Sequence, residues 1–422
     1  MGIIFNIIIC LAFLFGVAAQ AAETGSVPGA DVAELLALVQ AQNPELAVMR
    51  HETEAASGRT SSAGALPDPT LLISLQDVSN KQAGGPTTLA PSQVGSTYYR
   101  VMQPLPFWGK RGLQQEIAEA EASQAQGRQG ATWASLAASV KTEFAQYYLL
   151  VQSQKLTQDI LDVTLNMEHI AKARYATGLA PQQDVIRAQL EQTGLRRDLV
   201  MLDSERHHSM TRLNTLLQRE PNAALAEPQR LRALPTAAKL DYATLSERLH
   251  KQNPQLFTLQ AQLNAADKSR DLAYRNRYPD FALGVGATQM GNGIKEWELM
   301  VEFNIPLQQG SRRGKEREAE NMLAAAQSRK QAAASQLQGE LATNLSALEA
   351  ARRVETLTSS SLLPQAEATL QAAYVGYQNG KVDFATLLDA QRQIMKAKLD
   401  VLNAQVQAQI SYAQIEKLLG EE

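Results

Sequence analysis

The segment Gln42-Asn43-Pro44-Glu45-Leu46 recurs as Gln252-Asn253-Pro254-Gln255-Leu256, at an offset of 210 residues in a chain of 422. Further pairs follow in the same order: Pro69 matches Pro279 at 210, and Pro104-Leu105, Lys110-Arg111-Gly112, Tyr175 and Gly178 match Pro306-Leu307, Arg312-Arg313-Gly314, Tyr377 and Gly380 at 202. Matches that keep their order over such a distance indicate a tandem duplication. The difference of eight residues between the offsets predicts a longer loop in the first half, and the stretch 84–91, rich in Gly, Pro and Thr, has the composition of that loop.

The duplication divides the chain into a leader at 1–21, a first repeat at 22–218, a Pro-rich linker at 219–240 and a second repeat at 241–422. Residues 3–19 are apolar and uncharged, and Ala19-Gln20-Ala21 then fits the cleavage pattern of a secretory signal peptide. No Lys or Arg precedes the apolar run, so a retained membrane anchor remains the alternative.

Each repeat is expected to contain two short β-strands, because apolar and polar residues alternate after its first helix. In the second repeat, Trp297, Leu299 and Val301 alternate with a polar set that includes Glu298 and Glu302. Runs of 8–10 residues can cross a bilayer as tilted strands, but four strands are too few to close a transmembrane barrel. A pair of surface hairpins on a soluble domain is therefore the alternative.

Long helices are expected after the strands. The distances from Gly112 to Gly178 and from Gly314 to Gly380 are both 66 residues, and only Pro364 interrupts either stretch. A helix of that length spans roughly 100 Å, and the proline predicts a break or kink. Return helices at 182–218 and 384–418 complete two antiparallel hairpins with glycine-containing tips.

The composition excludes several classes of protein. Lys and Arg total 40 against 43 Asp and Glu, without the basic excess typical of nucleic-acid binding. One cysteine, Cys10, rules out a disulfide framework. The adjacent pair His207 and His208 diverges on a helix, so we predict no metal site. Neither a phosphate-binding glycine loop nor a Ser-His-Asp arrangement is recognisable.

The duplicated order of helix, strand pair, long helix, glycine tip and return helix resembles the TolC-type outer-membrane efflux proteins over nearly the whole mature chain. The segments 65–69 (ALPDP) and 103–111 (QPLPFWGKR) are most similar to the heavy-metal branch that serves RND-type pumps. The resemblance implies a mainly α fold with a small β part. Helical hairpins would form a periplasmic α-barrel, and three protomers with four strands each would close a twelve-stranded outer-membrane β-barrel.

The resemblance also implies a function. A homotrimer in the outer membrane of a Gram-negative cell, extending into the periplasm, would be a passive duct without catalysis or cofactor. Its partners would be a periplasmic adaptor, an inner-membrane RND-type pump and outer-membrane lipid. Heavy-metal cations are the expected cargo, with drugs or a type I secreted polypeptide as alternatives. A periplasmic coiled-coil adaptor or scaffold that never enters the membrane is the alternative from another class.

The resemblance assigns a periplasmic gate just beyond the tips. Asp184 and Asp389 match positions that line the family's constriction, and Tyr377 matches an aromatic residue that helps to close it. Thr386 stands where the family prototype has an acid, and Val382 where it has a basic residue. We therefore expect a thinner or differently built closing network. The alternative is that both aspartates pair locally with the arginine three residues further on, Arg187 or Arg392.

Two further sets of residues are candidate sites. By resemblance, the tip loops 175–180 and 377–382 contact the adaptor, with Gly178, Leu179, Gly380 and Lys381 at their centres. A simple helix-helix turn is the alternative. In the strands, Arg100, Glu298 and Glu302 face away from the apolar side, so we predict that they face the barrel lumen, since charges on the lipid face are costly.

Overall fold

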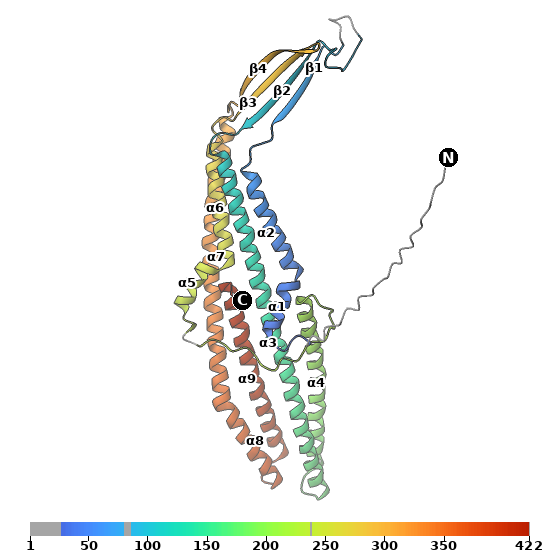
Figure 1. Ribbon diagram of the computed structural model, residues 1–422. Helices are drawn as coiled ribbons and strands as arrows, with labels where there is room; N and C mark the ends of the chain where they lie inside the picture. Colours follow the sequence, from blue (N-terminus) through green and yellow to red (C-terminus); the bar gives the residue numbers. More distant parts are fainter. Residues whose placement is uncertain (1–26, 80–85, 237–238, 422) are drawn as a thin grey trace, which may run out of the picture.

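The computed structural model describes residues 27–79, 86–236 and 239–421 and shows an elongated helical bundle with a four-stranded sheet at one end (Figure 1). The predicted leader, residues 1–21, lies outside the described residues, as do Gly84 and Gly85 of the predicted loop. The first half contains α1 (Val32–Gln42), α2 (Pro44–Ala63), β1 (Thr70–Gln76), β2 (Ser96–Leu105), α3 (Lys110–Ala176) and α4 (Gln182–Leu216). The second contains α5 (Tyr242–Gln252), α6 (Pro254–Arg275), β3 (Phe281–Met290), β4 (Gly293–Phe303), α7 (Gln309–Leu357), α8 (Leu363–Gln378) and α9 (Phe384–Leu419). The matching order of elements confirms the internal repeat.

The repeated Asn-Pro motif fastens the two ends of each half together. Asn43 caps α2 by accepting a hydrogen bond from the Glu45 backbone N–H at 2.9 Å, and Pro44 occupies the first turn. The Asn43 amide also donates to the carbonyl of Leu216, the last residue of α4, at 3.2 Å. In the second half, Asn253 caps α6 and donates to the Leu418 carbonyl at 2.8 Å. One buried side chain thus satisfies orphan backbone groups at two helix ends.

The two long helical stretches have the predicted positions but differ in regularity. The helix α3 runs unbroken for 67 residues, whereas its counterpart consists of α7, a π-helical turn at Thr358–Leu362, and α8. Pro364 lies at the start of α8, where its missing N–H and its ring cannot fit a regular helix. The π-turn directly before it absorbs this misfit, so the predicted break takes the form of a bulge within a continuous helical stretch.

All four strands form one antiparallel sheet in the order β1-β2-β3-β4. The two halves join in this sheet, because β2 of the first half pairs with β3 of the second, with Val101 opposite Val285. The β1–β2 connection spans residues 77–95 and the β3–β4 connection only two residues, which agrees with the longer loop predicted for the first half. Within the described residues, the outer edges of β1 and β4 have no strand partner.

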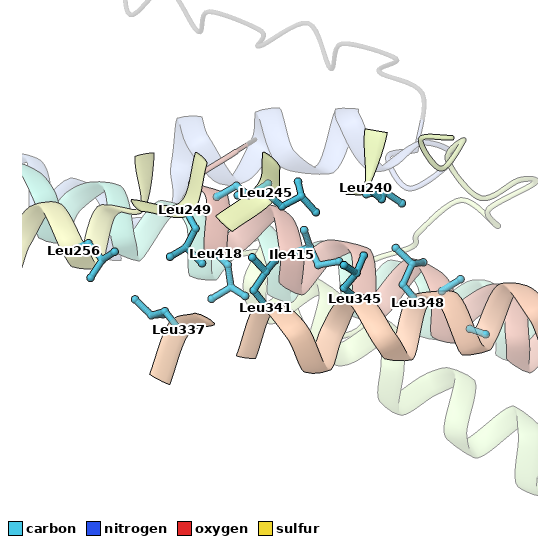
Figure 2. Packing of buried hydrophobic residues seen from close by; sticks show 13 residues of the cluster. Leu240, Leu245, Leu249, Leu256, Leu337, Leu341, Leu345, Leu348, Ile415 and Leu418 are labelled. Carbon is cyan, nitrogen blue, oxygen red and sulfur yellow. The ribbon is translucent and has the colours of Figure 1, made fainter. Parts of the chain in front are cut away.

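The hydrophobic core is a series of seams between helices. The largest cluster joins α5, α7 and α9 at the middle of the molecule (Figure 2), where Leu341 and Leu348 of α7 meet Leu249 of α5 and Ile415 of α9. Leu337, Leu341, Leu345 and Leu348 lie three or four residues apart, so they line one face of α7. Along α9 the small residues Ala390, Ala397, Ala404 and Ser411 are buried at intervals of seven. Small side chains at this spacing let α9 pack closely against α3 and α7.

Candidate functional site

The two hairpin tips lie at the end of the bundle opposite the sheet (Figure 1). They adopt the same turn, because Gly178 and Gly380 have φ values of +74° and +72°. The Leu179 N–H donates to the Arg174 carbonyl and the Lys381 N–H to the Gly376 carbonyl, both at 2.8 Å. A positive φ is costly for residues with a Cβ, so glycine is needed at both tips. Leu179 and Lys381 are exposed beside these glycines; their contact with an adaptor stays a prediction.

Asp184 and Tyr377 meet between the two hairpins. Asp184 lies in the first turn of α4, and Tyr377 lies near the end of α8. The Tyr377 hydroxyl donates to the Asp184 carboxylate at 3.2 Å, and both side chains are buried. The local pair of Asp184 with Arg187, considered from the sequence, is therefore not the contact that the structure shows. The observed pair joins the first hairpin to the second within one chain.

The surroundings of Tyr377 keep it a hydrogen-bond donor. Its ring packs edge to face on Phe384 at 5.2 Å, and the Arg174 guanidinium carbon lies 5.1 Å from the ring centre. Burial, followed by the negative charge of Asp184, raises the pKa of Tyr377 to about 12. The hydroxyl is therefore protonated, and able to donate its hydrogen bond, throughout the physiological pH range.

Asp389 and Thr386 are not part of this buried link. The Asp389 side chain is 69 % exposed and lies 3.9 Å from Arg392, which is the local pairing that the sequence left open. The Thr386 backbone N–H donates to Asp383, so Thr386 belongs to the capped first turn of α9. Val382 packs against Gly376, with a methyl group where a Cβ on that glycine would lie. Of the predicted gate residues, only Asp184 and Tyr377 contact each other directly.

Sequence reasoning missed three residues that link the hairpins. Arg392 of α9 binds Glu191 of α4 with two hydrogen bonds, of 2.5 and 3.3 Å. Nearer the tip, Arg174 of α3 donates to the Gln378 carbonyl of α8 at 2.6 Å. Arg174 lies in the last turn of a helix that ends at a tip, where cations are favoured. That position could have pointed to Arg174 in the sequence. The pairing of Glu191 with Arg392 could not have been found from the sequence, because it depends on how the helices pack.

A buried carboxylate also holds the first hairpin together below its tip. Glu168 of α3 accepts from the amides of Gln189 and Gln192 of α4 at 2.8 and 2.7 Å, and pairs with Lys172 at 2.8 Å. The hydrogen bond from Lys172, followed by those from the two glutamines, lowers the pKa of Glu168 to about 2. The carboxylate is therefore ionised at any physiological pH.

The sheet has one apolar face and one polar face. Leu71, Val101, Val285 and Leu299 lie opposite one another across all four strands. The other face carries Arg100, Glu298 and Glu302, as the alternation predicted. On it, the Tyr98 hydroxyl donates to Glu298 at 2.5 Å and accepts from Arg100 at 3.1 Å. That this face lines a lumen stays a prediction.

The described residues contain no cluster of three or more histidine, cysteine, aspartate or glutamate side chains that could hold a metal ion. Both His207 and His208 are exposed on α4.

Among the helices of the described residues, none is apolar over the length needed to cross a bilayer.

A sheet with an exposed apolar face, joined to two long helical hairpins, defines the architecture of outer-membrane efflux channels. The family model for the outer membrane efflux protein matches residues 35–218 and 245–421. The chain therefore belongs to the outer membrane efflux protein family. It is an outer-membrane efflux channel that extends into the periplasm, and not an enzyme.

Individual relatives agree with this assignment. The chain is 23 % identical over 390 residues to the cobalt-zinc-cadmium resistance protein CzcC of Cupriavidus metallidurans, covering 91 % of this chain and 88 % of that protein. Its fold is similar to that of the outer-membrane channel OprN, with a TM-score of 0.79, 19 % identity and coverage of 93 % and 90 %. The outer membrane protein VceC of Vibrio cholerae has a TM-score of 0.78, 20 % identity and coverage of 92 % and 96 %.

Proposed function

We propose that this channel is the exit duct of a tripartite efflux system and that its cargo is heavy-metal cations. The observation that carries the cargo assignment is the similarity to CzcC, a protein named for resistance to cobalt, zinc and cadmium, over 91 % of this chain. The duct itself would be passive, as expected of a member of the outer membrane efflux protein family. An inner-membrane RND-type pump would supply the energy, and a periplasmic adaptor would connect pump and duct.

A homotrimer would account for the two unpaired edges of the sheet. Both outer strands, β1 and β4, have free edges in the described chain, and unpaired edges are not tolerated within a bilayer. Three copies of this sheet, joined edge to edge, would give a closed barrel of twelve strands. Its apolar face, on which Leu299 is 81 % exposed and Trp297 is 72 % exposed, would then face lipid. Arg100, Glu298 and Glu302 would face the lumen.

We further propose that the hairpin tips form the gate of the duct. The buried Tyr377–Asp184 hydrogen bond would hold the second hairpin against the first in the closed state. Exposed Asp389 lies in the second turn of α9, beyond the tip loop, where three copies around an axis would make a ring of like charge. Such rings attract cations. The tip loops with Leu179 and Lys381 would dock the adaptor.

Removal of the gene from a host with an otherwise intact efflux system tests the cargo. We expect hypersensitivity to cobalt, zinc and cadmium salts and a raised cellular metal content, restored by the plasmid-borne gene. A variant with Leu179 replaced by aspartate should not restore resistance, although its trimer reaches the outer membrane in normal amount. Hypersensitivity to organic drugs with unchanged metal tolerance would assign the duct to drug efflux instead.

A further inference from the structure

The side chain of Arg174 binds both hairpin tips at once. Its Nη1 donates to the Gln378 carbonyl of the second hairpin at 2.6 Å, and its Nη2 donates to the Leu179 carbonyl of the first at 3.2 Å. Gln378 is the last residue of α8, so its carbonyl has no partner within the helix. The positive charge of Arg174 thus lies at the negative end of the α8 dipole.

The same guanidinium fixes the tyrosine of the proposed gate. Its central carbon is 5.1 Å from the centre of the Tyr377 ring, within the range of a cation–π contact. Phe384 packs on the same ring at 5.2 Å, and the Tyr377 hydroxyl reaches Asp184. Tyr377 is therefore held at its ring by Arg174 and Phe384 and at its hydroxyl by Asp184, while the carbonyl of the next residue is held by Arg174.

Arg174 makes these contacts without an acidic partner. Among the ion pairs of the described residues, none includes Arg174, whereas Arg392 binds Glu191 between the same two hairpins. The Arg174 Nε is buried and has no hydrogen-bond partner in the described part of the chain. The Nε–H of Arg174 is thus left unsatisfied, while its two terminal nitrogens donate to carbonyls of the two hairpin tips. The planar fork of the guanidinium presents a separate N–H donor to each of the two carbonyls.

We propose that Arg174 is the positioning residue of the gate, which clamps the second tip to the first and aims the Tyr377 hydroxyl at Asp184. This inference rests on the proposed gate and assigns its regulation to a residue outside the Tyr377–Asp184 pair. Arg174 touches no cargo in this arrangement; it acts through Tyr377. Loss of the clamp should free the second tip to move outward as a unit with α8.

The glycine at the second tip leaves room for the clamp. A Cβ added at Gly380 would lie 3.2 Å from the Arg174 Nη2, whereas one added at Gly178 would meet nothing within 4 Å. Both glycines have positive φ, so alanine strains both backbones alike. Of the two substitutions, only the one at Gly380 would also press on Arg174, whose Nη2 must then move by a few tenths of an ångström. The pair of variants Gly380→Ala and Gly178→Ala therefore separates the clamp from the turn.

Single-channel recording of purified trimers in planar bilayers tests the proposal. We expect Arg174→Lys and Arg174→Gln to raise the open probability at least about 10-fold, since lysine loses at least one of the two charge-assisted hydrogen bonds to the tips and glutamine loses the charge behind both. The control Arg196→Lys changes an exposed arginine of α4 and should leave gating unchanged. In a Tyr377→Phe background, Arg174→Lys should add little, because both changes release the same link. A purely structural role would instead lower thermal stability equally in both backgrounds.

The outcomes separate this proposal from the gate itself. If Tyr377→Phe and Asp184→Asn leave the conductance unchanged, the gate is wrong and the clamp has nothing to position. If those variants open the channel while Arg174→Lys gates like Arg196→Lys, the gate stands and the role of Arg174 is overturned. If Arg174 variants fail to assemble, the glycine pair decides: opening in Gly380→Ala but not in Gly178→Ala supports the clamp, and equal behaviour refutes it.

Discussion

The hydroxyl of Tyr377 in the second hairpin donates a hydrogen bond of 3.2 Å to the buried carboxylate of Asp184 in the first. This contact joins residues that lie 193 positions apart in the sequence. A hydrogen bond to a buried charge is worth more than one between neutral groups, because a carboxylate that loses its donor keeps its desolvation cost. The link can therefore bias the arrangement of two long hairpins.

Replacement of Tyr377 by phenylalanine should open the channel. The ring would keep its packing on Phe384, and only the hydroxyl would be lost. We expect the closed state to lose about 1.5–3 kcal/mol, which shifts the opening equilibrium about 10- to 150-fold. Open probability in planar bilayers measures the change. Tyr175→Phe is the matched control, since Tyr175 holds the equivalent place in the first tip but is exposed. Equal effects of the two variants would contradict the gate.

Asp389 should control ion selectivity rather than closure. Its carboxylate is exposed and lies 3.9 Å from Arg392, so its removal costs little folding free energy, about 0.5 kcal/mol or less. We expect Asp389→Asn to lower the preference for cations, read from the reversal potential in a salt gradient, with open probability near that of the wild type. Asp198→Asn serves as control, because Asp198 of α4 is a partly exposed acid that pairs with Arg197. An unchanged reversal potential would remove Asp389 from the conduction path.

Much of the fold could be predicted from the sequence because it depends on local signals that occur twice. The Asn-Pro pairs, the alternating strands and the tip glycines are local patterns. In each of them the residue type itself indicates the backbone conformation at that position. For Asn43 and Asn253 the sequence showed a repeated motif. It could not show that each amide also closes the end of a distant return helix, because that contact exists only after packing.

The candidate gate was predictable only in part, for the same reason. Resemblance pointed to Asp184 and Tyr377, and the structure brings them together. It also grouped Asp389 and Thr386 with them, and their part in a gate stays a prediction: Asp389 is exposed and Thr386 lies in a capped turn. Arg174 was missed because its contacts are to backbone carbonyls, which every residue has and which leave no trace in a sequence.

The attachment of the linker between the halves should depend on a buried cluster of ion pairs. Glu416 of α9 binds Lys141 of α3 at 3.0 Å and Arg232 of the linker at 2.7 Å, and its side chain is only 8 % exposed. Glu416→Ala would leave two cations without this partner, which typically costs about 3–5 kcal/mol. We expect a lower melting temperature and faster tryptic cleavage at Arg232. Glu349→Ala, which breaks an exposed pair with Arg353, should change neither.

The first hairpin should loosen in acid through Glu168. Its pKa is lowered from 4.5 to about 2 by its hydrogen bonds to Lys172, Gln192 and Gln189. A depressed carboxyl pKa stabilises the folded hairpin fully above pH 4.5, and this contribution is lost as the pH falls towards 2. Hydrogen exchange in α4, corrected for its intrinsic pH dependence, should therefore accelerate between pH 4.5 and 2.

The variant Glu168→Gln identifies the source of that acid response. It removes the ionised acceptor, so exchange near the tip should already be faster at pH 7, by an amount equivalent to about 1–3 kcal/mol, and should vary less with pH. Glu247→Gln is the matched control, because Glu247 makes an exposed helical pair with Lys251 at 2.6 Å and touches neither hairpin tip. An undiminished acid response in Glu168→Gln would place the responsible carboxylate elsewhere in the bundle.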